Sequence, residues 1–350
     1  MITIKEIAEL TGVSTTTVSN VIHGKTHKVS KNTIDKVQQA LKAGGYVQRQ
    51  GLEALTSRHA RLVMAVVHTT RRYVNTPVSD PFFGQVIGAI EEELRACGYY
   101  MLLYIDSDID RIFETALSWN VSGIIAVPIS YVNYQKLRSL SDCPVVGIDV
   151  HNDAPEGEPM HGLHVTLDDY AAAFALGRYL TGCGIRDVLT LAEGRVGSSF
   201  DRWQGMTDAL SGIPGTNERV TAISPSGRLV MPDDPERRHL LLRAVLPLAG
   251  HDCALFCTSD QLAFFVLQFL SSNGIEVPQQ LSLCGFDDSP YAEFSSPKLT
   301  TMRQDFPSKG QAAVRLLLDA IDHPSGEDRI VTLTATLVVR RSVRSVWQRT

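Results

Sequence analysis

The sequence lacks the features that mark membrane-inserted, disulfide-stabilised and metal-binding proteins. No apolar run approaches the ~20 residues that a helix needs to span a bilayer, and Met1 leads into a capped helical segment instead of a signal peptide. Only six of the 350 residues are cysteines, and no second Cys/His pair at metal-ligand spacing accompanies Cys253 and Cys257. We therefore expect reduced core thiols, no bound metal and a cytoplasmic location.

The motifs of common enzyme classes are missing as well. There is no Gly-rich phosphate loop ending in Lys-Ser/Thr, no GxSxG, no HExxH, and no GxGxxG after the first apolar run. Histidines with no evident site spacing are His68, His151, His161 and His164. Asp149 and Asp287 remain conceivable as a general acid/base pair, but no nucleophile accompanies them. We expect a protein that is not an enzyme and has no cofactor.

A helix-turn-helix pattern occupies the amino terminus, from Thr3 to Gly24. Gly12 can adopt the backbone angles of a tight turn between two helices, and Ser14 is suited to N-cap the second one. The apolar residues that would pack the two helices together are Ile4, Ile7, Ala8, Val18, Val21 and Ile22. The polar residues left outward on the second helix are Thr15, Thr16, Ser19 and Asn20. This pattern is typical of DNA-binding proteins.

A third amphipathic helix follows and completes a small all-α unit. Ser30 is a candidate N-cap, and Ile34, Val37 and Leu41 repeat at helical spacing until Gly44 and Gly45 end the helix. Residues 1–58 hold six Lys and two Arg against three Glu and one Asp, a net charge of +4, while the remainder carries −9 of the total −5. The basic excess on the helix-turn-helix favours docking on the phosphates of DNA.

From Leu62 onward, short apolar runs alternate with amphipathic stretches. The first runs are LVMAVV (62–67), YMLLYI (100–105), GIIAV (123–127) and VVGI (145–148). A second series comprises LHVT (163–166), VLTLA (188–192), RVTAI (219–223), CALFC (253–257) and LSLC (281–284). Strands alternating with helices predict parallel sheets covered on both faces. The α/β body should therefore consist of two Rossmann-like subdomains with a ligand cleft between them.

Several motifs resemble the lactose-repressor (LacI/GalR) family of bacterial transcription regulators. In the amino-terminal headpiece these are TIKEIAELTGVS, TVSNVIHG, VSKNTIDKVQQAL and the GGY that ends at Tyr46. In the body they are DPFF (80–83), GFDD (285–288), LTTMRQDF (299–306) and TLVVRRS (336–342). The resemblance covers nearly the whole chain and implies a sensor body of the periplasmic sugar-binding-protein type.

This organisation implies a headpiece at 1–46, a hinge at 47–61, an effector-binding body at 62–340 and a tail at 341–350. The crossings between lobes make each lobe discontinuous. The N-lobe is expected at about 62–163 and 290–325, and the C-lobe at about 164–289 and 326–340.

For the headpiece we expect base contacts from α-helical residues and phosphate contacts around them. Asn20 can bond adenine bidentately, and the methyl groups of Thr15 and Thr16 can touch those of thymine, with Ser19 beside them. The candidate phosphate contacts are Lys5, Lys28, Ser30 and Lys31. By resemblance, Leu55 matches a hinge leucine that is pushed between base pairs in the minor groove. Gln48, Gly51 and Glu53 depart from the family pattern in this hinge, and an ordinary linker leucine is the alternative.

For the body, candidate effector contacts fall where strands end and loops begin, at positions that match the family's ligand-reading ones. They are Phe82, Phe83, Asp149, Ser198, Arg202, Asp287 and Gln304. Carboxylates and a guanidinium suit a polyhydroxylated ligand, on whose face Phe82 or Phe83 could stack. The alternatives are helix N-capping for the two Asp residues, a surface salt bridge for Arg202 and core positions for the Phe residues. The loop 68–80, with Arg71 and Arg72, could favour an acidic or larger ligand or be a solvated surface loop.

The sequence therefore predicts a homodimeric repressor that binds a pseudo-palindromic DNA operator and responds to a small sugar-like effector. Regulation by a purine, an acidic sugar derivative or a protein corepressor is the alternative, and an α/β enzyme acting on sugars or nucleosides is a more distant one.

Overall fold

The computed structural model forms two compact units, Met1–His59 and Ala60–Thr350, each of which is described by itself. The structure describes residues 3–22, 25–27, 29–43, 61–68, 80–151, 159–192, 197–211, 213–215, 217–222, 241–250, 252–324 and 326–344. Within these ranges, no helix combines the length and the apolar character needed to cross a membrane.

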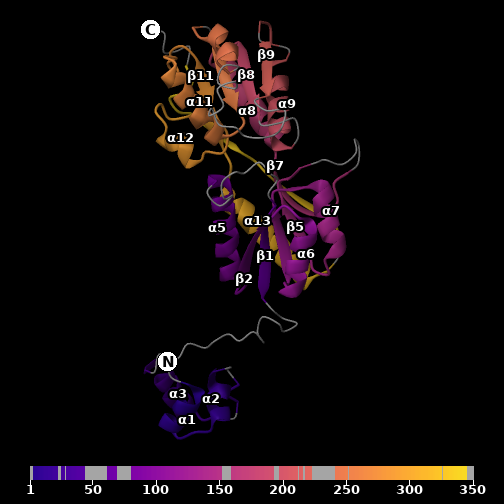
Figure 1. The fold of residues 1–350 in the computed structure, drawn as a ribbon, viewed down its shortest axis with the longest axis vertical. Coiled ribbons are helices and arrows are strands. Elements are labelled where there is room, and N and C mark those ends of the chain that lie inside the picture. The colour runs from indigo at the N-terminus through magenta and orange to yellow at the C-terminus, as the bar shows by residue number, and fades with distance from the viewer. Residues whose placement is uncertain are drawn as a thin grey trace. The chain divides into compact units, whose positions relative to one another are not determined.

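The first unit is a three-helix headpiece, as the sequence predicts. Its helices are α1 (Ile4–Thr11), α2 (Thr15–Ile22) and α3 (Lys31–Ala43) (Figure 1). Residues buried in their shared core are Ile7, Ala8, Val18, Val21 and Val37. Residues packed around that core include Ile4, Ile22, Ile34 and Leu41. The periodic apolar residues of the three helices therefore pack into one small hydrophobic core.

Local hydrogen bonds fix where the headpiece helices begin. Ser14 Oγ accepts from the Thr17 N–H at 3.1 Å, and Ser30 Oγ accepts from the Thr33 N–H at 3.2 Å. Both expected N-caps are confirmed. Gly12 ends α1 with φ 68°, a left-handed conformation that residues with a Cβ atom rarely adopt. The expected tight turn between α1 and α2 is therefore also confirmed.

The body contains a six-stranded parallel sheet in the order β13-β7-β5-β3-β1-β2. Its strands are β1 (Leu62–His68), β2 (Tyr100–Asp106), β3 (Gly123–Val127), β5 (Val145–Ile148), β7 (Leu163–Leu167) and β13 (Arg329–Leu333). Val63 and Val67 of β1 pack against one pair of helices, α5 (Pro81–Ala96) and α13 (Phe306–Asp322). Met64 and Val66 face the other pair, α6 (Ile109–Ser118) and α7 (Tyr131–Leu140). Alternating residues of a parallel strand thus bury both faces of the sheet, as the apolar runs predict.

A second parallel sheet, in the order β11-β10-β8-β9, forms the other lobe of the body (Figure 1). Its strands are β8 (Asp187–Ala192), β9 (Asn217–Ala222), β10 (Cys253–Cys257) and β11 (Ser282–Cys284). The helices of this lobe are α8 (Asp169–Gly182), α9 (Ser198–Leu210), η2 (Leu246–Leu248), α11 (Asp260–Ser272) and α12 (Pro290–Phe294). Leu255 of β10 packs towards α11, whereas Phe256 packs towards α8 and α9. Both sheets are therefore covered on two sides, as expected for Rossmann-like subdomains.

Two small pairings complete the body. The short strands β4 (Ile129–Ser130) and β6 (Val150–His151) pair in parallel, and β12 (Thr301–Arg303) pairs antiparallel with β14 (Thr336–Val338). Because both crossing segments pair through β12 and β14, they are held side by side where the chain passes between the lobes.

Strand pairing divides the chain between the lobes differently from the sequence expectation. From the sequence, the C-lobe is expected to begin at about 164 and to include 326–340, but β7 pairs with both β5 and β13 in the first sheet. Ala292 and Leu299, expected in the N-lobe, pack in the core of the second sheet. An apolar run indicates a strand without indicating its sheet, because the partner strand is distant in sequence.

The cysteines divide by position. All six are free thiols, and Cys253, Cys257 and Cys284 are buried in the second sheet. Cys97 is exposed after α5, so the expectation of core thiols does not extend to it. Among the described residues, no group of His, Cys, Asp and Glu side chains is arranged to hold a metal ion.

Candidate functional site

Helix α2 presents the candidate base-reading residues on the side away from the headpiece core. Thr15 and Thr16 are exposed, and Ser19 and Asn20 are half-buried. Val18 and Val21 of the same helix are buried, so the two sets of side chains lie on different faces. The geometry suits a recognition helix, whose outward side chains read base edges in the major groove.

The candidate phosphate contacts flank this helix. Lys5 on α1 and Lys31 at the start of α3 are exposed. Ser30 is exposed too, but its hydroxyl already accepts the Thr33 N–H and shares a hydrogen bond with the Thr33 hydroxyl at 2.8 Å. Its first role is therefore to cap α3. The candidates Lys28 and Leu55 lie outside the described residues, as do Gln48, Gly51, Glu53 and most of the loop that contains Arg71 and Arg72.

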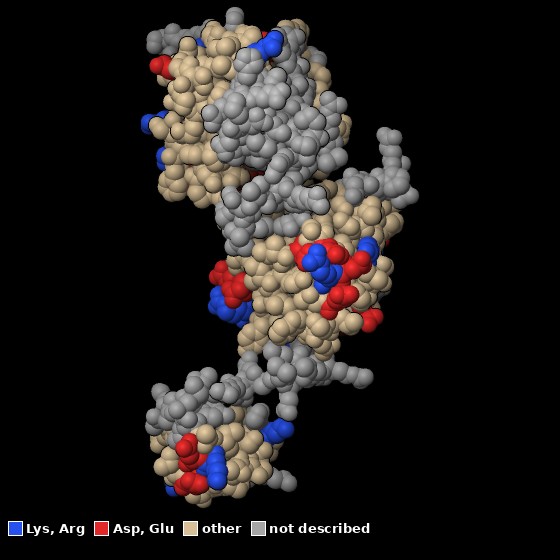
Figure 2. Space-filling view, viewed as in Figure 1, with Lys and Arg blue, Asp and Glu red and all other residues tan. Residues whose placement is uncertain are grey.

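On the body, the face shown in Figure 2 carries charges of both signs next to one another. Arg111 of α6 pairs with Asp106 and Asp108, and Lys136 of α7 pairs with Asp110. Interspersed pairs of this kind are typical of a solvated surface.

Two candidate effector residues follow strands in different lobes. Asp149 comes directly after β5, and Asp287 lies three residues after β11. Their φ angles are 49° and 118°, which are uncommon for residues with a Cβ atom. Asp287 donates its backbone N–H to the Met302 carbonyl at 2.8 Å, which holds this strained loop in place. Unusual backbone of this kind clusters at binding sites.

Arg202 lies in a buried ion pair, not in the surface salt bridge that the sequence left open. Its Nε donates to Asp169 Oδ1 at 2.7 Å, and its Nη1 donates to the Thr258 carbonyl at 2.6 Å. The guanidinium carbon lies 3.7 Å from the centre of the Phe286 ring, and Nη1 is 3.8 Å from Asp287 Oδ1. These contacts fix the guanidinium plane next to the Asp287 carboxylate.

Gln304 and Lys309 connect the candidate residues of the two lobes. The Gln304 side-chain amide donates to Asp287 Oδ1 at 2.7 Å, and its oxygen accepts from Lys309 Nζ at 2.8 Å. Lys309 Nζ also donates to both carboxylate oxygens of Asp149, at 2.9 and 2.7 Å. Asp149, Lys309, Gln304, Asp287, Arg202 and Asp169 thus form one chain of polar contacts, which we call the cleft cluster.

Burial changes the proton affinity of the cleft cluster. Removal from water raises the pKa of Asp287 well above its usual range, and the nearby Arg202 guanidinium opposes this effect only in part. Burial likewise raises the pKa of Asp169 despite its pairing with Arg202. Burial in the cleft cluster therefore disfavours the charged forms of Asp287 and Asp169.

The two candidate phenylalanines have different environments. Phe83 is 1% exposed and belongs to the core between α5, α13 and the first sheet, so its alternative as a core residue fits the structure. Phe82 is only partly buried, and its ring centre lies 5.7 Å from that of Phe306 and 5.5 Å from Lys309 Nζ. Ser198 is half-buried at the first position of α9, one turn before Arg202. Of the two candidate phenylalanines, Phe82 is therefore the one that lies next to the cleft cluster.

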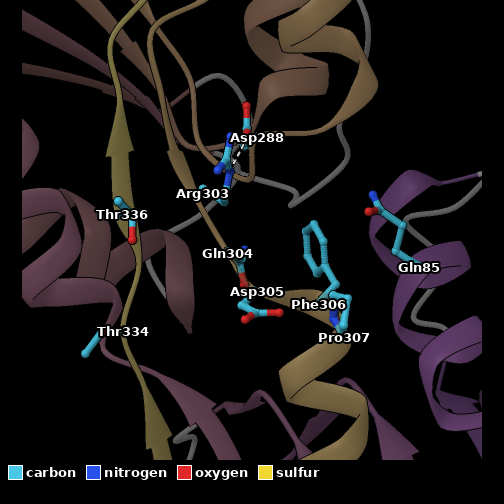
Figure 3. Close-up of a pocket in the computed structure, with 9 residues that line it drawn as sticks. All are labelled: Gln85, Asp288, Arg303, Gln304, Asp305, Phe306, Pro307, Thr334 and Thr336. Atoms are coloured by element: carbon cyan, nitrogen blue, oxygen red, sulfur yellow. Dashed lines mark hydrogen bonds and ion pairs between the residues drawn. The ribbon is translucent and has the colours of Figure 1, made fainter. Parts of the chain in front are cut away.

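A pocket of about 520 Å³ lies beside the cleft cluster, at the segments that cross between the lobes. It is lined by Gln85, Asp288, Arg303, Gln304, Asp305, Phe306, Pro307, Thr334 and Thr336. Figure 3 shows Gln85 of α5 across from Phe306 at the start of α13, with Arg303 bonded to Asp288 above them. Gln304 belongs to both the pocket and the cleft cluster, so the two are contiguous.

Two members of the cleft cluster, Asp169 and Lys309, are not among the contacts expected from the sequence. Asp169 is the first residue of α8, and acidic residues are common in the first turn of a helix, so its sequence position gives no sign of a binding role. Lys309 gives a stronger signal, because it shares the helical spacing of buried residues such as Phe306, Ala313 and Leu316. A lysine on the core face of an amphipathic helix requires a buried partner.

Family models match both units of the chain. The model "Bacterial regulatory proteins, lacI family" matches residues 3–48, and the model "Periplasmic binding protein-like domain" matches residues 178–343. Together they cover more than half of the sequence. The first match includes the headpiece helices, and the second includes Arg202, Asp287 and Gln304.

Similar proteins match along their whole length. The "HTH-type transcriptional repressor PurR" of Mannheimia succiniciproducens is 28% identical over 354 residues, covering 99% of this chain and 100% of the relative. The protein of the same name from Haemophilus influenzae is 27% identical over 358 residues, with coverage of 99% and 100%.

Solved structures share the fold. A lac repressor dimer bound to operator and the anti-inducer ONPF has a TM-score of 0.77 at 20% identity, covering 98% of this chain and 99% of that one. The regulator CelR in complex with cellobiose has a TM-score of 0.67 at 24% identity, with coverage of 98% and 100%. From the two family models and the full-length relatives, the chain belongs to the lacI family of bacterial regulatory proteins, as a DNA-binding transcriptional repressor with a ligand-binding body, and it is not an enzyme.

Proposed function

We propose that a small, uncharged or weakly charged sugar-like effector binds at the cleft cluster and controls the affinity of the repressor for its operator. The observation that carries this proposal is the hydrogen bonding of Gln304 to Asp287 and Lys309, which joins groups from both lobes. A ligand that contacts these groups has different interactions in an open and a closed arrangement of the lobes. Such a difference is what effector control of a two-state protein requires.

The chemistry of the cleft cluster supports a polyhydroxylated ligand. Asp149 and Asp287 keep 16% and 14% of their side chains exposed, which leaves carboxylate oxygens able to accept from adjacent hydroxyls. The partly buried Phe82 ring offers an apolar face for the C–H side of a sugar. The CelR structure contains cellobiose, which is a property of that protein, but it is consistent with a sugar in this fold.

The headpiece supplies the DNA contacts. The repressor acts as a homodimer, and its two headpieces bind two half-sites of a pseudo-palindromic operator. Asn20, Thr15 and Thr16 read base edges with Ser19 beside them, and Lys5, Lys28 and Lys31 contact phosphates. Because the operator is chromosomal DNA, we place the protein in the cytoplasm.

A ligand screen tests the proposed effector class. The full chain is heated with a panel of sugars, uronates, sugar phosphates and purines, and the unfolding midpoint is measured. A ligand at 100 times its dissociation constant should stabilise the folded state by about 2.7 kcal/mol. The hits are then added to a gel-shift assay with operator DNA. Stabilisation by purines alone would replace the sugar assignment with the purine alternative.

The hinge has its own test, because Leu55 is proposed as a minor-groove wedge. Leu55→Ala should weaken binding to operator DNA far more than binding to nonspecific DNA, since only a bent specific complex uses the wedge. Leu52→Ala is the matched control in the same segment. Equal losses on both DNAs would indicate a passive linker.

A further inference from the structure

Lys309 is the cation that joins Asp149 to Gln304 in the cleft cluster. Its side chain is 1% exposed. Its ammonium group donates to Asp149 Oδ1, Asp149 Oδ2 and Gln304 Oε1, at 2.9, 2.7 and 2.8 Å. The same nitrogen lies 5.5 Å from the centre of the Phe82 ring. Lys309 therefore contacts three of the residues to which the proposed function assigns the effector.

We propose that the Lys309–Asp149 pair is a specificity determinant that selects an effector without net charge where it contacts the pair. This inference rests on the proposed function, because it assumes that a sugar-like ligand occupies the cleft cluster. Lys309 acts on the ligand's charge, and Asp149 cancels the charge of Lys309. The selection is therefore a property of both side chains together.

Charge balance in the cleft cluster is the first argument. The cations Lys309 and Arg202 each have a carboxylate partner, Asp149 and Asp169, at 2.7 Å. Asp169 also interacts electrostatically with Asp149 and Lys309, so the two pairs are close enough to act as one set. A charge brought into this set by a ligand finds no free counter-charge among these four side chains. An uncompensated charge in a buried site is strongly unfavourable.

The third carboxylate, Asp287, strengthens this argument. It accepts a hydrogen bond from the Gln304 amide and lies 3.8 Å from Arg202, which is already bonded to Asp169. Burial raises the pKa of Asp287 well above its usual range, because removal from water disfavours a charged group at this position. A uronate or sugar phosphate placed beside Asp149 and Asp287 would be disfavoured in the same way. A neutral sugar would bring hydroxyls that both donate and accept.

The Lys309–Asp149 ion pair determines which ligand charge the site favours, because each member balances the charge of the other. Lys309 is the only cation bonded to Asp149 among the interactions of the described residues. Replacing one member of the pair leaves the other without its counter-charge. Asp149→Asn leaves a buried ammonium, which should favour a carboxylate on the ligand. Lys309→Met leaves a buried carboxylate, which should favour an ammonium on the ligand.

Matched sugars test this inference on the full-length chain. The probes are glucose, glucosamine and glucuronate, together with the three galactose counterparts, in a buffer acidic enough to protonate the amino sugars. Affinities are measured by titration calorimetry, and the order of unfolding midpoints is measured in parallel. The variants are Asp149→Asn, Lys309→Met and the double variant. Lys136→Met is the matched control, because Lys136 pairs with Asp110 on the exposed surface.

The expected result is a change in the order of affinities. The wild-type protein and Lys136→Met should bind the neutral sugar of one series more tightly than both charged counterparts. Asp149→Asn should move the preference towards the uronate by about tenfold or more, and Lys309→Met should move it towards the amino sugar by a similar factor. The double variant removes both charges, so it should again prefer the neutral sugar and keeps the test valid if Lys309→Met does not fold.

Two contrary results have different meanings. Equal affinity of the wild-type protein for neutral and charged sugars, or an unchanged order in Asp149→Asn, would overturn the inference while leaving the sugar effector in place. If purines stabilise the wild-type protein and no sugar stabilises any variant, the proposed effector class fails and this inference fails with it.

Discussion

The Nε atom of Arg202 donates to Oδ1 of Asp169 at 2.7 Å, although the two residues lie on different helices of the second lobe, α9 and α8. Both side chains are buried, and the Phe286 ring covers the guanidinium. A buried pair adds little net stability compared with apolar residues, but loss of one partner leaves the other charge without compensation. The pair therefore orients Arg202 next to Asp287 more than it stabilises the fold.

Removing the Arg202 guanidinium should destabilise the protein strongly, although the intact ion pair adds little net stability. Arg202→Met leaves the Asp169 carboxylate buried and unpaired, and we expect it to lower the free energy of unfolding by about 3–5 kcal/mol. Arg111→Met, which removes an exposed arginine paired with Asp108, should cost less than about 1 kcal/mol. Urea unfolding of both variants measures the difference. Equal losses would show that burial of the Arg202 pair has no special consequence.

Close packing of α8 against α9 should make Gly205 sensitive to a single methyl group. A Cβ atom at Gly205 would overlap the backbone carbonyl of Tyr170, which cannot move independently of α8. We expect Gly205→Ala to destabilise the body by about 1–3 kcal/mol. Gly182→Ala places a methyl group in open space in α8 and should be neutral or stabilising by up to about 1 kcal/mol. Thermal unfolding of both variants tests the contact, and a stabilised Gly205→Ala would contradict it.

Asp260 should make the stability of the body depend on pH. It accepts from the Thr301 hydroxyl at 2.6 Å and from the Ser289 N–H at 2.8 Å, yet burial dominates and raises its pKa from 3.8 to about 7. Between these pH values the folded state keeps a proton that the unfolded chain has lost. The contribution of Asp260 to stability therefore falls as pH rises from 3.8 to about 7, by at most about 1.4 kcal/mol per pH unit.

Asp260→Asn isolates this contribution, because the amide does not titrate. Its oxygen can accept from the Ser289 N–H, while its NH2 group donates to the Thr301 hydroxyl oxygen. We expect the variant to gain stability relative to the wild-type protein as pH rises through this window, with a constant difference above it. Unfolding midpoints at a series of pH values supply the measurement. Parallel pH profiles for the two proteins would assign the titration to other groups.

Headpiece residues should separate into base readers and phosphate contacts. Asn20→Ala should lose about 1–3 kcal/mol of discrimination at one base pair of each half-site, with a small effect on nonspecific DNA. Lys5→Ala should weaken binding to all sequences alike and reduce the slope of log affinity against log salt by about 1. Binding to a library of operator variants at several salt concentrations distinguishes the two. Unchanged base preference in Asn20→Ala would remove it from the readers.

Local signals determine the headpiece and the strand series of the body. Ser14, Ser30 and Gly12 act on backbone groups within a few residues, so their capping and turn roles can be predicted from neighbouring sequence. The strands β1, β2, β3 and β5 follow the apolar runs because a buried parallel strand needs apolar residues on both faces. The strand-end positions of Asp149 and Asp287 follow from the same runs.

The sequence by itself therefore determined a helix-turn-helix headpiece, two α/β lobes and most of the residues at the cleft. Only the tertiary structure decided that β7 and β13 join the first sheet and that Lys309, 160 residues after Asp149, is that carboxylate's partner. Capping and periodicity arise from neighbouring residues, so the sequence states them directly. Sheet membership and buried ion pairs depend on segments that meet only after folding. The sequence can indicate that a buried charge such as Lys309 needs a partner, but not which residue that partner is.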